Sequence, residues 1–120
     1  MKILVIEDDH WFAESLATTI HQADKQTQVK IVDDGHNAMQ VIDEWKPDLL
    51  ILDMMLGLQN GLSLLNELQS YSDTRIIPVV VMSVDTKRLE IDDLRQFGVL
   101  KIINKADITS EILAEVISDV

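Results

Sequence analysis

The stretch LLILD, residues 49–53, joins four consecutive apolar residues to a single aspartate. A short apolar run of this kind is typical of a strand buried on both faces of a parallel sheet. A second run, ILVI at residues 3–6, ends in the same way, because the acidic triplet EDD follows it at residues 7–9. If the two runs are neighbouring parallel strands, Asp53 and the triplet meet at one edge of the sheet. This pairing decides both the predicted fold and the place of its candidate site.

Strand-like and helix-like patterns alternate along the rest of the chain. The predicted strands cover Ile3–Ile6, Val29–Val32, Leu49–Leu52, Ile76–Met82 and Val99–Ile103. One-sided apolar stripes predict helices at His10–Ala23, His36–Trp45, Gly61–Leu68 and Thr86–Phe97, and a last helix that begins at Asp107 or Thr109. Five strands alternating with five helices predict a parallel sheet covered on both faces, since each parallel crossover needs a helix-sized connection. We expect a doubly wound, flavodoxin-like α/β fold with strand order 2-1-3-4-5, which brings the first and third strands together.

The length and composition indicate one globular domain that spans residues 1–120. The chain is 47% hydrophobic and 26% charged, which is typical of a soluble protein. No apolar run approaches the roughly 20 residues that a membrane-spanning helix needs, and Met1-Lys2 leads directly into a strand without a signal pattern. We therefore expect a cytoplasmic protein that does not associate with membranes.

Charge and cysteine content exclude several kinds of function. The chain has no cysteine, which excludes disulfides, thiolate zinc sites and thiol catalysis. Its net charge of −11 argues against direct nucleic-acid binding by this domain, because phosphate backbones are bound by lysine and arginine surfaces. The same acidity suits a site that collects a cation.

Carboxylates that converge at one sheet edge repel one another unless a cation lies among them. Mg²⁺ takes oxygen ligands, and proteins typically hold it by one or two carboxylates together with phosphate oxygens of a substrate. The expected meeting of Glu7, Asp8 and Asp53 therefore predicts a Mg²⁺ site for phosphoryl chemistry. Asp9 lies just outside this group, and we predict that it caps the helix that follows.

Two further polar residues follow strands that end at the same edge. Ser83 ends the fourth strand, and Lys105 comes shortly after the fifth. An acidic pair, an acid, a hydroxyl and an ammonium, delivered in this order by strands one, three, four and five, resemble the receiver domain of two-component response regulators. The resemblance covers essentially the whole chain.

The resemblance implies that Asp53 accepts a phosphoryl group from a sensor histidine kinase or a phosphotransfer protein. It also implies that Mg²⁺ is held by Glu7, Asp8, Asp53 and the backbone carbonyl of Met55. Lys105 would neutralise one phosphoryl oxygen, which is the electrostatic assistance that phosphoryl transfer needs. The protein would then be a switch that assists its own phosphorylation and dephosphorylation, and not an enzyme acting on other substrates.

In the same resemblance Ser83 hydrogen-bonds a second phosphoryl oxygen and moves inward, and the resulting change controls an output domain or partner. A homodimer and a C-terminal DNA-binding output domain outside this chain are further expectations. Two departures stand against the family pattern: Ile102 lies where many members have Tyr or Phe, and Ala106 lies where many have a cis proline. They motivate an alternative, a pseudo-receiver that serves as a dimerisation or docking module without phosphorylation. A hydrolase forming an aspartyl phosphate ranks last, because Met55 occupies the place of its usual second acid.

Overall fold

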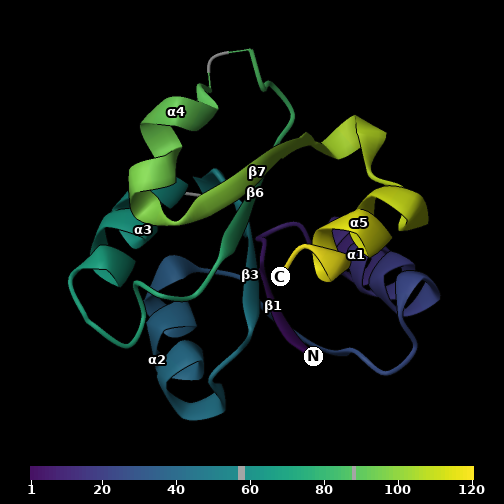
Figure 1. Cartoon of the computed structure of the whole chain (residues 1–120), viewed down its shortest axis with the longest axis horizontal. Coiled ribbons are helices and arrows are strands. Elements are labelled where there is room, and N and C mark those ends of the chain that lie inside the picture. Colours follow the sequence, from purple (N-terminus) through teal and green to yellow (C-terminus); the bar gives the residue numbers. More distant parts are fainter. Residues whose placement is uncertain (57–58, 88) are drawn as a thin grey trace.

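The computed structural model describes residues 1–56, 59–87 and 89–120 (Figure 1). Its main sheet consists of β1 (Lys2–Ile6), β2 (Gln28–Val32), β3 (Leu49–Asp53), β6 (Val79–Ser83) and β7 (Val99–Asn104). All neighbouring strands of this sheet are parallel, and their order is β2-β1-β3-β6-β7. This arrangement confirms the predicted doubly wound fold and the neighbourhood of the first and third strands.

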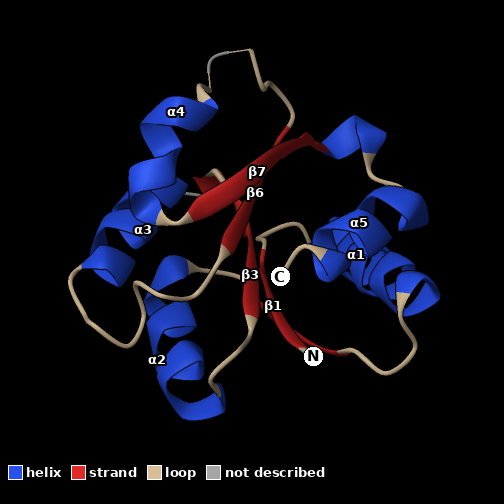
Figure 2. Ribbon diagram, viewed as in Figure 1, coloured by secondary structure: helices blue, strands red, loops and turns tan. Residues whose placement is uncertain are grey.

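Helices cover both faces of the sheet (Figure 2). They are α1 (His10–Ala23), α2 (Gly35–Trp45), α3 (Gly61–Gln69), α4 (Ile91–Leu94) and α5 (Ser110–Ser118), with 3-10 turns η1 (Arg95–Phe97) and η2 (Lys105–Asp107). Helices α1 and α5 lie together on one face, and α2, α3 and α4 lie on the other (Figures 1 and 2). No helix in the described ranges is long and apolar enough to cross a bilayer.

The alternation of side chains along the strands divides the core into two layers. Leu50 and Leu52 of β3 belong to the layer under α2, α3 and α4, whereas Leu49 and Ile51 belong to the layer under α1 and α5. All four side chains are at most 2% exposed. Burial on both faces explains why the strand is a continuous apolar run, and it holds the following Asp53 at a fixed edge.

The ends of the helices follow from local side-chain chemistry. The Asp9 carboxylate accepts a hydrogen bond from the backbone N–H of Phe12, as predicted for the cap of α1. Thr109 caps α5 in the same way through the N–H of Ile112, so the last helix begins at the second of the two predicted positions. Gly98 ends η1 with a φ of 80°, which a glycine adopts without a steric cost.

Two predicted boundaries were wrong. The fourth strand begins at Val79 and not at Ile76, because Pro78 has no N–H for the ladder and Ile77 donates to the carbonyl of Thr74 in a turn. Among the described residues of the helix predicted for Thr86–Phe97, only α4 and η1 are helical, and residue 88 lies outside the described residues. The Asp85 carboxylate accepts from the N–H of Lys87, and this local bond competes with helix formation.

A two-stranded antiparallel hairpin, β4 (Met55–Leu56) and β5 (Gln59–Asn60), was not predicted. It connects β3 to α3 and begins two residues after Asp53. Gly57 and Leu58 lie outside the described residues. The hairpin matters for the site because its first residue contacts the Asp53 carboxylate.

Candidate functional site

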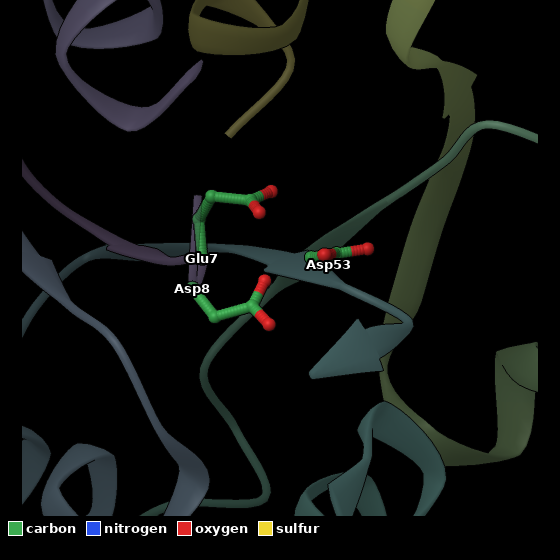
Figure 3. A group of neighbouring side chains, drawn as sticks. All are labelled: Glu7, Asp8 and Asp53. Carbon is green, nitrogen blue, oxygen red and sulfur yellow. The ribbon is translucent and has the colours of Figure 1, made fainter. Parts of the chain in front are cut away.

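The acidic residues of the site follow two adjacent strands. Ile6 of β1 pairs with Leu52 of β3, so Glu7 and Asp53 leave the sheet at the same level. The N–H of Glu7 continues the ladder by donating to the carbonyl of Val32 at 3.0 Å. Figure 3 shows the carboxylates of Glu7, Asp8 and Asp53 gathered at this edge.

The three carboxylates are close but differ in exposure. Each offers one oxygen, and these oxygens lie within 4.8 Å of one another. Glu7 is fully buried and Asp53 is 3% exposed, whereas Asp8 is exposed. Two buried acids and one solvent-facing acid therefore form an acidic group at the edge where the register of the two strands brings them together.

Lys105 reaches into the acidic group from the turn that follows β7. Its Nζ lies 2.6 Å from Glu7 Oε2 and 3.2 Å from Asp53 Oδ2. The side chain is only 14% exposed. This ammonium is the cation that offsets the two buried carboxylates, and the sequence prediction placed it correctly beside Asp53.

Backbone donors hold the remaining carboxylate oxygens. The N–H of Asp9 donates to Glu7 Oε1 at 3.0 Å, and the N–H of Met55 donates to Asp53 Oδ1 at 3.0 Å. Each buried carboxylate thus has one oxygen on a backbone N–H and the other on Lys105. Such bonds orient the carboxylates as well as stabilising their charge.

Burial dominates the protonation equilibrium of Glu7. Desolvation raises the pKa of Glu7 to about 7, even though Lys105 and the N–H of Asp9 lower it, and the negative charge of Asp53 raises it further. Burial alone lowers the pKa of Lys105, but the hydrogen bond to Glu7 and the two nearby carboxylates outweigh burial and raise it. Lys105 is therefore charged at neutral pH, whereas Glu7 titrates near it.

Phe12 is a member of the site that sequence reasoning missed. Lys105 Nζ lies 4.5 Å from the centroid of the Phe12 ring, which is the distance of a cation–π contact. The helical stripe of α1 marks Phe12 as a core residue only, and it also packs against the core layer under α1 and α5. Its contact with Lys105 depends on the packing of α1 against the strand ends, which no local pattern contains.

Ser83 lies at the predicted edge of the sheet, but its hydroxyl is hydrogen-bonded to the backbone of Asp85. Residue 82 pairs with Asp53, so Ser83 follows one position beyond it on the adjacent strand. The Ser83 hydroxyl donates to the carbonyl of Asp85 at 3.1 Å and accepts from its N–H at 3.2 Å. Ser83 therefore closes a tight turn in this state.

The residues present fit a hard divalent cation. Glu7, Asp8 and Asp53 supply only carboxylate oxygens, and their spacing allows one oxygen of each to approach a common ion. Glu7 Oε2 is paired with the ammonium of Lys105 at 2.6 Å, so a cation already lies beside this buried oxygen. The backbone carbonyl of Met55 remains a predicted ligand.

The peptide bond between Lys105 and Ala106 is trans. Asn104 arranges this turn, because its side chain accepts from the N–H of Ala106 at 2.9 Å. Ile102 is half-buried and packs against the core layer under α2, α3 and α4. Both departures from the family pattern are thus accommodated without disturbing Lys105.

Comparisons with known proteins agree with this fold. The model of the response regulator receiver domain matches residues 3–117. The DNA-binding response regulator MtrA of Mycolicibacterium smegmatis is 31% identical over 90 residues, which are 75% of this chain and 37% of that protein. The chain thus spans less than two fifths of that relative.

Two solved structures have the same fold over nearly the whole chain. The signal receiver domain of a DNA-binding response regulator from Colwellia psychrerythraea 34H has a TM-score of 0.83 and 25% identity, covering 99% of this chain and 96% of that one. A sensor protein from Polaromonas sp. JS666 has a TM-score of 0.88 and 23% identity, covering 98% of this chain and 93% of that one. The second likeness concerns the fold alone.

Proposed function

Because this chain belongs to the response regulator receiver domain family of two-component signalling, we propose that it is a phosphorylation-controlled switch of the cytoplasm whose phosphoacceptor is Asp53. The phosphoryl donor is a phosphohistidine of a sensor kinase or of a phosphotransfer protein. Phosphorylation then shifts the conformation that an output domain or partner recognises. The chain is thus a signalling switch and not an enzyme with a separate substrate.

One observation carries this proposal: the Asp53 carboxylate lies at a strand end between a charged lysine and two further carboxylates. Lys105 Nζ is 3.2 Å from Asp53 Oδ2, and an oxygen of each of Glu7 and Asp8 lies within 4.8 Å of an Asp53 oxygen. A carboxylate that only capped a strand would need none of these neighbours. Their convergence supports a role in binding a phosphoryl group and a cation.

The reaction requires a carboxylate nucleophile. An Asp53 oxygen forms a bond to phosphorus, the bond between phosphorus and the donor imidazole nitrogen breaks, and the imidazole leaves with the electron pair of that bond. The product is an acyl phosphate on Asp53. The N–H of Met55, bonded to Asp53 Oδ1, fixes the plane of the carboxylate before the attack.

Lys105 supplies positive charge where the phosphoryl oxygens arrive. In the present state its ammonium contacts both buried carboxylates, and transfer of one contact to a phosphoryl oxygen needs only a small movement. The Phe12 ring lies under the ammonium and limits where it can go. Glu7, Asp8 and Asp53 would hold Mg²⁺, which would supply positive charge to offset the phosphoryl charge.

Ser83 is the group that responds to the new phosphoryl. Its hydroxyl would leave the two bonds with the Asp85 backbone and donate to a phosphoryl oxygen, which moves the turn after β6. The charge on Asp53 biases an equilibrium between two arrangements of this turn and of the neighbouring α4 and β7. Ile102 of β7 packs in the core layer that borders α4, so a movement of α4 would change the packing around Ile102.

The output is proposed from the relatives. MtrA is named a DNA-binding response regulator, and the chain spans only 37% of its length. We propose that this receiver controls a DNA-binding output domain, with a homodimer of the receiver as the active form. The domain itself, with a net charge of −11, does not bind nucleic acid in this proposal.

The test is the intact mass of the chain after incubation with phosphoramidate or acetyl phosphate and Mg²⁺. We expect one added phosphoryl group in the wild type and none in Asp53→Asn, which keeps the shape of the side chain. Omission of Mg²⁺ should also prevent the addition. Equal addition to the wild type and to Asp53→Asn would exclude Asp53 as the phosphoacceptor.

The state of Ser83 favours a second candidate, the pseudo-receiver. Both hydrogen-bonding functions of its hydroxyl are satisfied by Asp85, and Lys105 is closer to Glu7 than to Asp53. A module locked in this arrangement would dock partners without phosphorylation. If neither phosphoramidate nor acetyl phosphate adds a phosphoryl group, and calorimetry detects no Mg²⁺ binding, the pseudo-receiver is the correct alternative.

A further inference from the structure

A groove of about 400 Å³ lies between α2 and the segment that follows α3. Met39 and Asp43 line it from α2, Glu67 from α3, and Tyr71, Asp73 and Thr74 from the following segment. A second hollow of about 310 Å³ continues it, since Asp43, Asp73 and Thr74 line both. We call the two together the α2–α3 groove. Figure 1 shows the segment after α3 running beside α2.

The α2–α3 groove lies at the opposite end of the strands from Asp53. Helix α2 ends at Trp45, residues 46–48 connect it to the start of β3, and the segment after α3 leads into the start of β6. Asp53 is the last residue of β3, about 13 Å along the strand from its first residue. A partner in the groove would therefore leave the phosphorylation site uncovered.

The groove combines an apolar floor with exposed apolar side chains at its border. Ile42 and Pro47 are buried beneath it. Tyr71 is 52% exposed and Ile76 is 76% exposed. Single exposed apolar residues are ordinary, but here Tyr71 lines the first hollow and Ile76 the second, so the groove offers two apolar contacts to a partner.

The wall of the groove is preformed. Thr74 is 5% exposed, and its hydroxyl donates to the carbonyl of Leu68 at 2.6 Å, which ties the segment after α3 to the end of that helix. The N–H of Ile77 donates to the Thr74 carbonyl and closes the next turn. Binding of a partner would therefore cost little conformational entropy for ordering this surface.

Charge decides which occupant the groove fits. The carboxylates of Asp43, Glu67 and Asp73 come from three different segments, and within the described ranges none of them has an ion pair or a hydrogen bond. Lys46 is the one base among the described lining residues. An anionic partner would be repelled here. A cationic side chain with apolar neighbours would match both the negative charge and the apolar surface of the groove.

We propose that the α2–α3 groove is a docking site for a basic amphipathic segment of a partner protein. An arginine or lysine of that segment lies among Asp43, Glu67 and Asp73, and apolar side chains beside it contact Tyr71 and Ile76. Arginine suits the site best, because its planar guanidinium pairs with carboxylates and stacks on an aromatic ring. The proposal does not depend on phosphorylation of Asp53.

The test is selection of a phage-displayed library of random twelve-residue peptides on the immobilised full chain. Binding of the recovered peptides is then measured by fluorescence anisotropy, and their site by amide shifts in NMR spectra. The groove variant is Asp43→Asn/Glu67→Gln/Asp73→Asn. The control variant, Glu14→Gln/Asp107→Asn/Glu111→Gln, loses the same charge at exposed positions of α1, η2 and α5, which are not among the residues that line the groove.

We expect the recovered peptides to combine arginine or lysine with apolar residues and to shift the amides of Met39, Tyr71 and Ile76. The groove variant should bind them at least about tenfold more weakly, and the control variant within about twofold of the wild type. Ile76→Ser, at an exposed position, should also weaken binding. Recovery of no peptide, equal weakening by both triple variants, or amide shifts confined to the Asp53 edge would each overturn the proposal.

Discussion

Lys105 Nζ lies 2.6 Å from a carboxylate oxygen of Glu7, a shorter contact than the 3.2 Å that it makes with Asp53. The lysine expected to serve the phosphoryl group is therefore shared between Asp53 and a second buried acid of the same site. Because Glu7 is fully buried, this ion pair is exposed to little screening by solvent. The contact links the protonation state of Glu7 to the position of Lys105.

Replacement of Lys105 by alanine should slow phosphorylation of Asp53 by about 10²–10³-fold, because it removes the positive charge beside the arriving phosphoryl oxygens. The measurement is the rate of phosphoryl addition followed by intact mass. Lys101→Ala is the matched control, since that lysine has only a 3.9 Å contact with Glu115 and its side chain is 45% exposed. An equal rate for Lys105→Ala and Lys101→Ala would contradict the role assigned to Lys105.

The stability of the metal-free protein should depend on pH through Glu7. Its pKa is about 7 in the fold against 4.5 ordinarily, so the folded state holds more protons than the unfolded state between these values. Stability contributed by protonated Glu7 is therefore complete below pH 4.5 and is lost as the pH rises through 7. The loss should amount to about 1–3 kcal/mol in the free energy of unfolding.

The measurement is urea unfolding at several pH values in a chelating buffer. Glu7→Gln is the comparison, because other groups titrate equally in both proteins. The difference between the two unfolding free energies should change across this range and stay constant above about pH 8. A constant difference from pH 4.5 upward would show that Glu7 has an ordinary pKa.

Asp8 and Asp9 should differ in their effect on Mg²⁺ affinity. Asp8→Asn removes one of the three carboxylates of Glu7, Asp8 and Asp53. It should weaken Mg²⁺ binding at least about tenfold, as measured by calorimetry. Asp9→Asn should leave the affinity nearly unchanged, because asparagine caps a helix as well as aspartate does. Equal losses in both variants would mean that the overall negative charge, and not this set of ligands, attracts the ion.

Gly61 should not tolerate a side chain. An added Cβ would lie 2.9 Å from Met54 Cα and 3.1 Å from the carbonyl oxygen of Asp53, so the backbone at Asp53 and Met54 would have to move. We expect Gly61→Ala to destabilise the fold by about 1–3 kcal/mol and to slow phosphorylation. Asn66→Ala, at an exposed position of the same helix, should do neither. Full stability and activity of Gly61→Ala would show that this backbone moves freely.

The order of the strands and the meeting of Glu7, Asp8 and Asp53 could be predicted, because continuous apolar runs mark buried parallel strands and a parallel sheet brings their ends to one edge. The position of Lys105 beside Asp53 followed from the same rule. These features depend on the periodicity of the sequence and on topology.

Features that depend on competing local bonds or on tertiary packing could not be predicted. Helix α4 begins only at Ile91, after a turn in which the Asp85 carboxylate accepts from the N–H of Lys87, and the amphipathic stripe does not reveal that turn. The contact of Phe12 with Lys105 and the Ser83 hydroxyl bonds with Asp85 require the packed strand ends. The α2–α3 groove likewise arises only when the segment after α3 lies beside α2.

The most direct test of the central claim is the position of the phosphoryl group. Borohydride reduces an acyl phosphate of aspartate to homoserine, so treatment of the phosphorylated chain followed by peptide mass mapping identifies the modified residue. We expect homoserine at residue 53 only, in a reaction that requires Mg²⁺. Homoserine at Asp8 or Asp9, or a phosphorylated chain without any homoserine, would contradict the assignment of Asp53 as the phosphoacceptor.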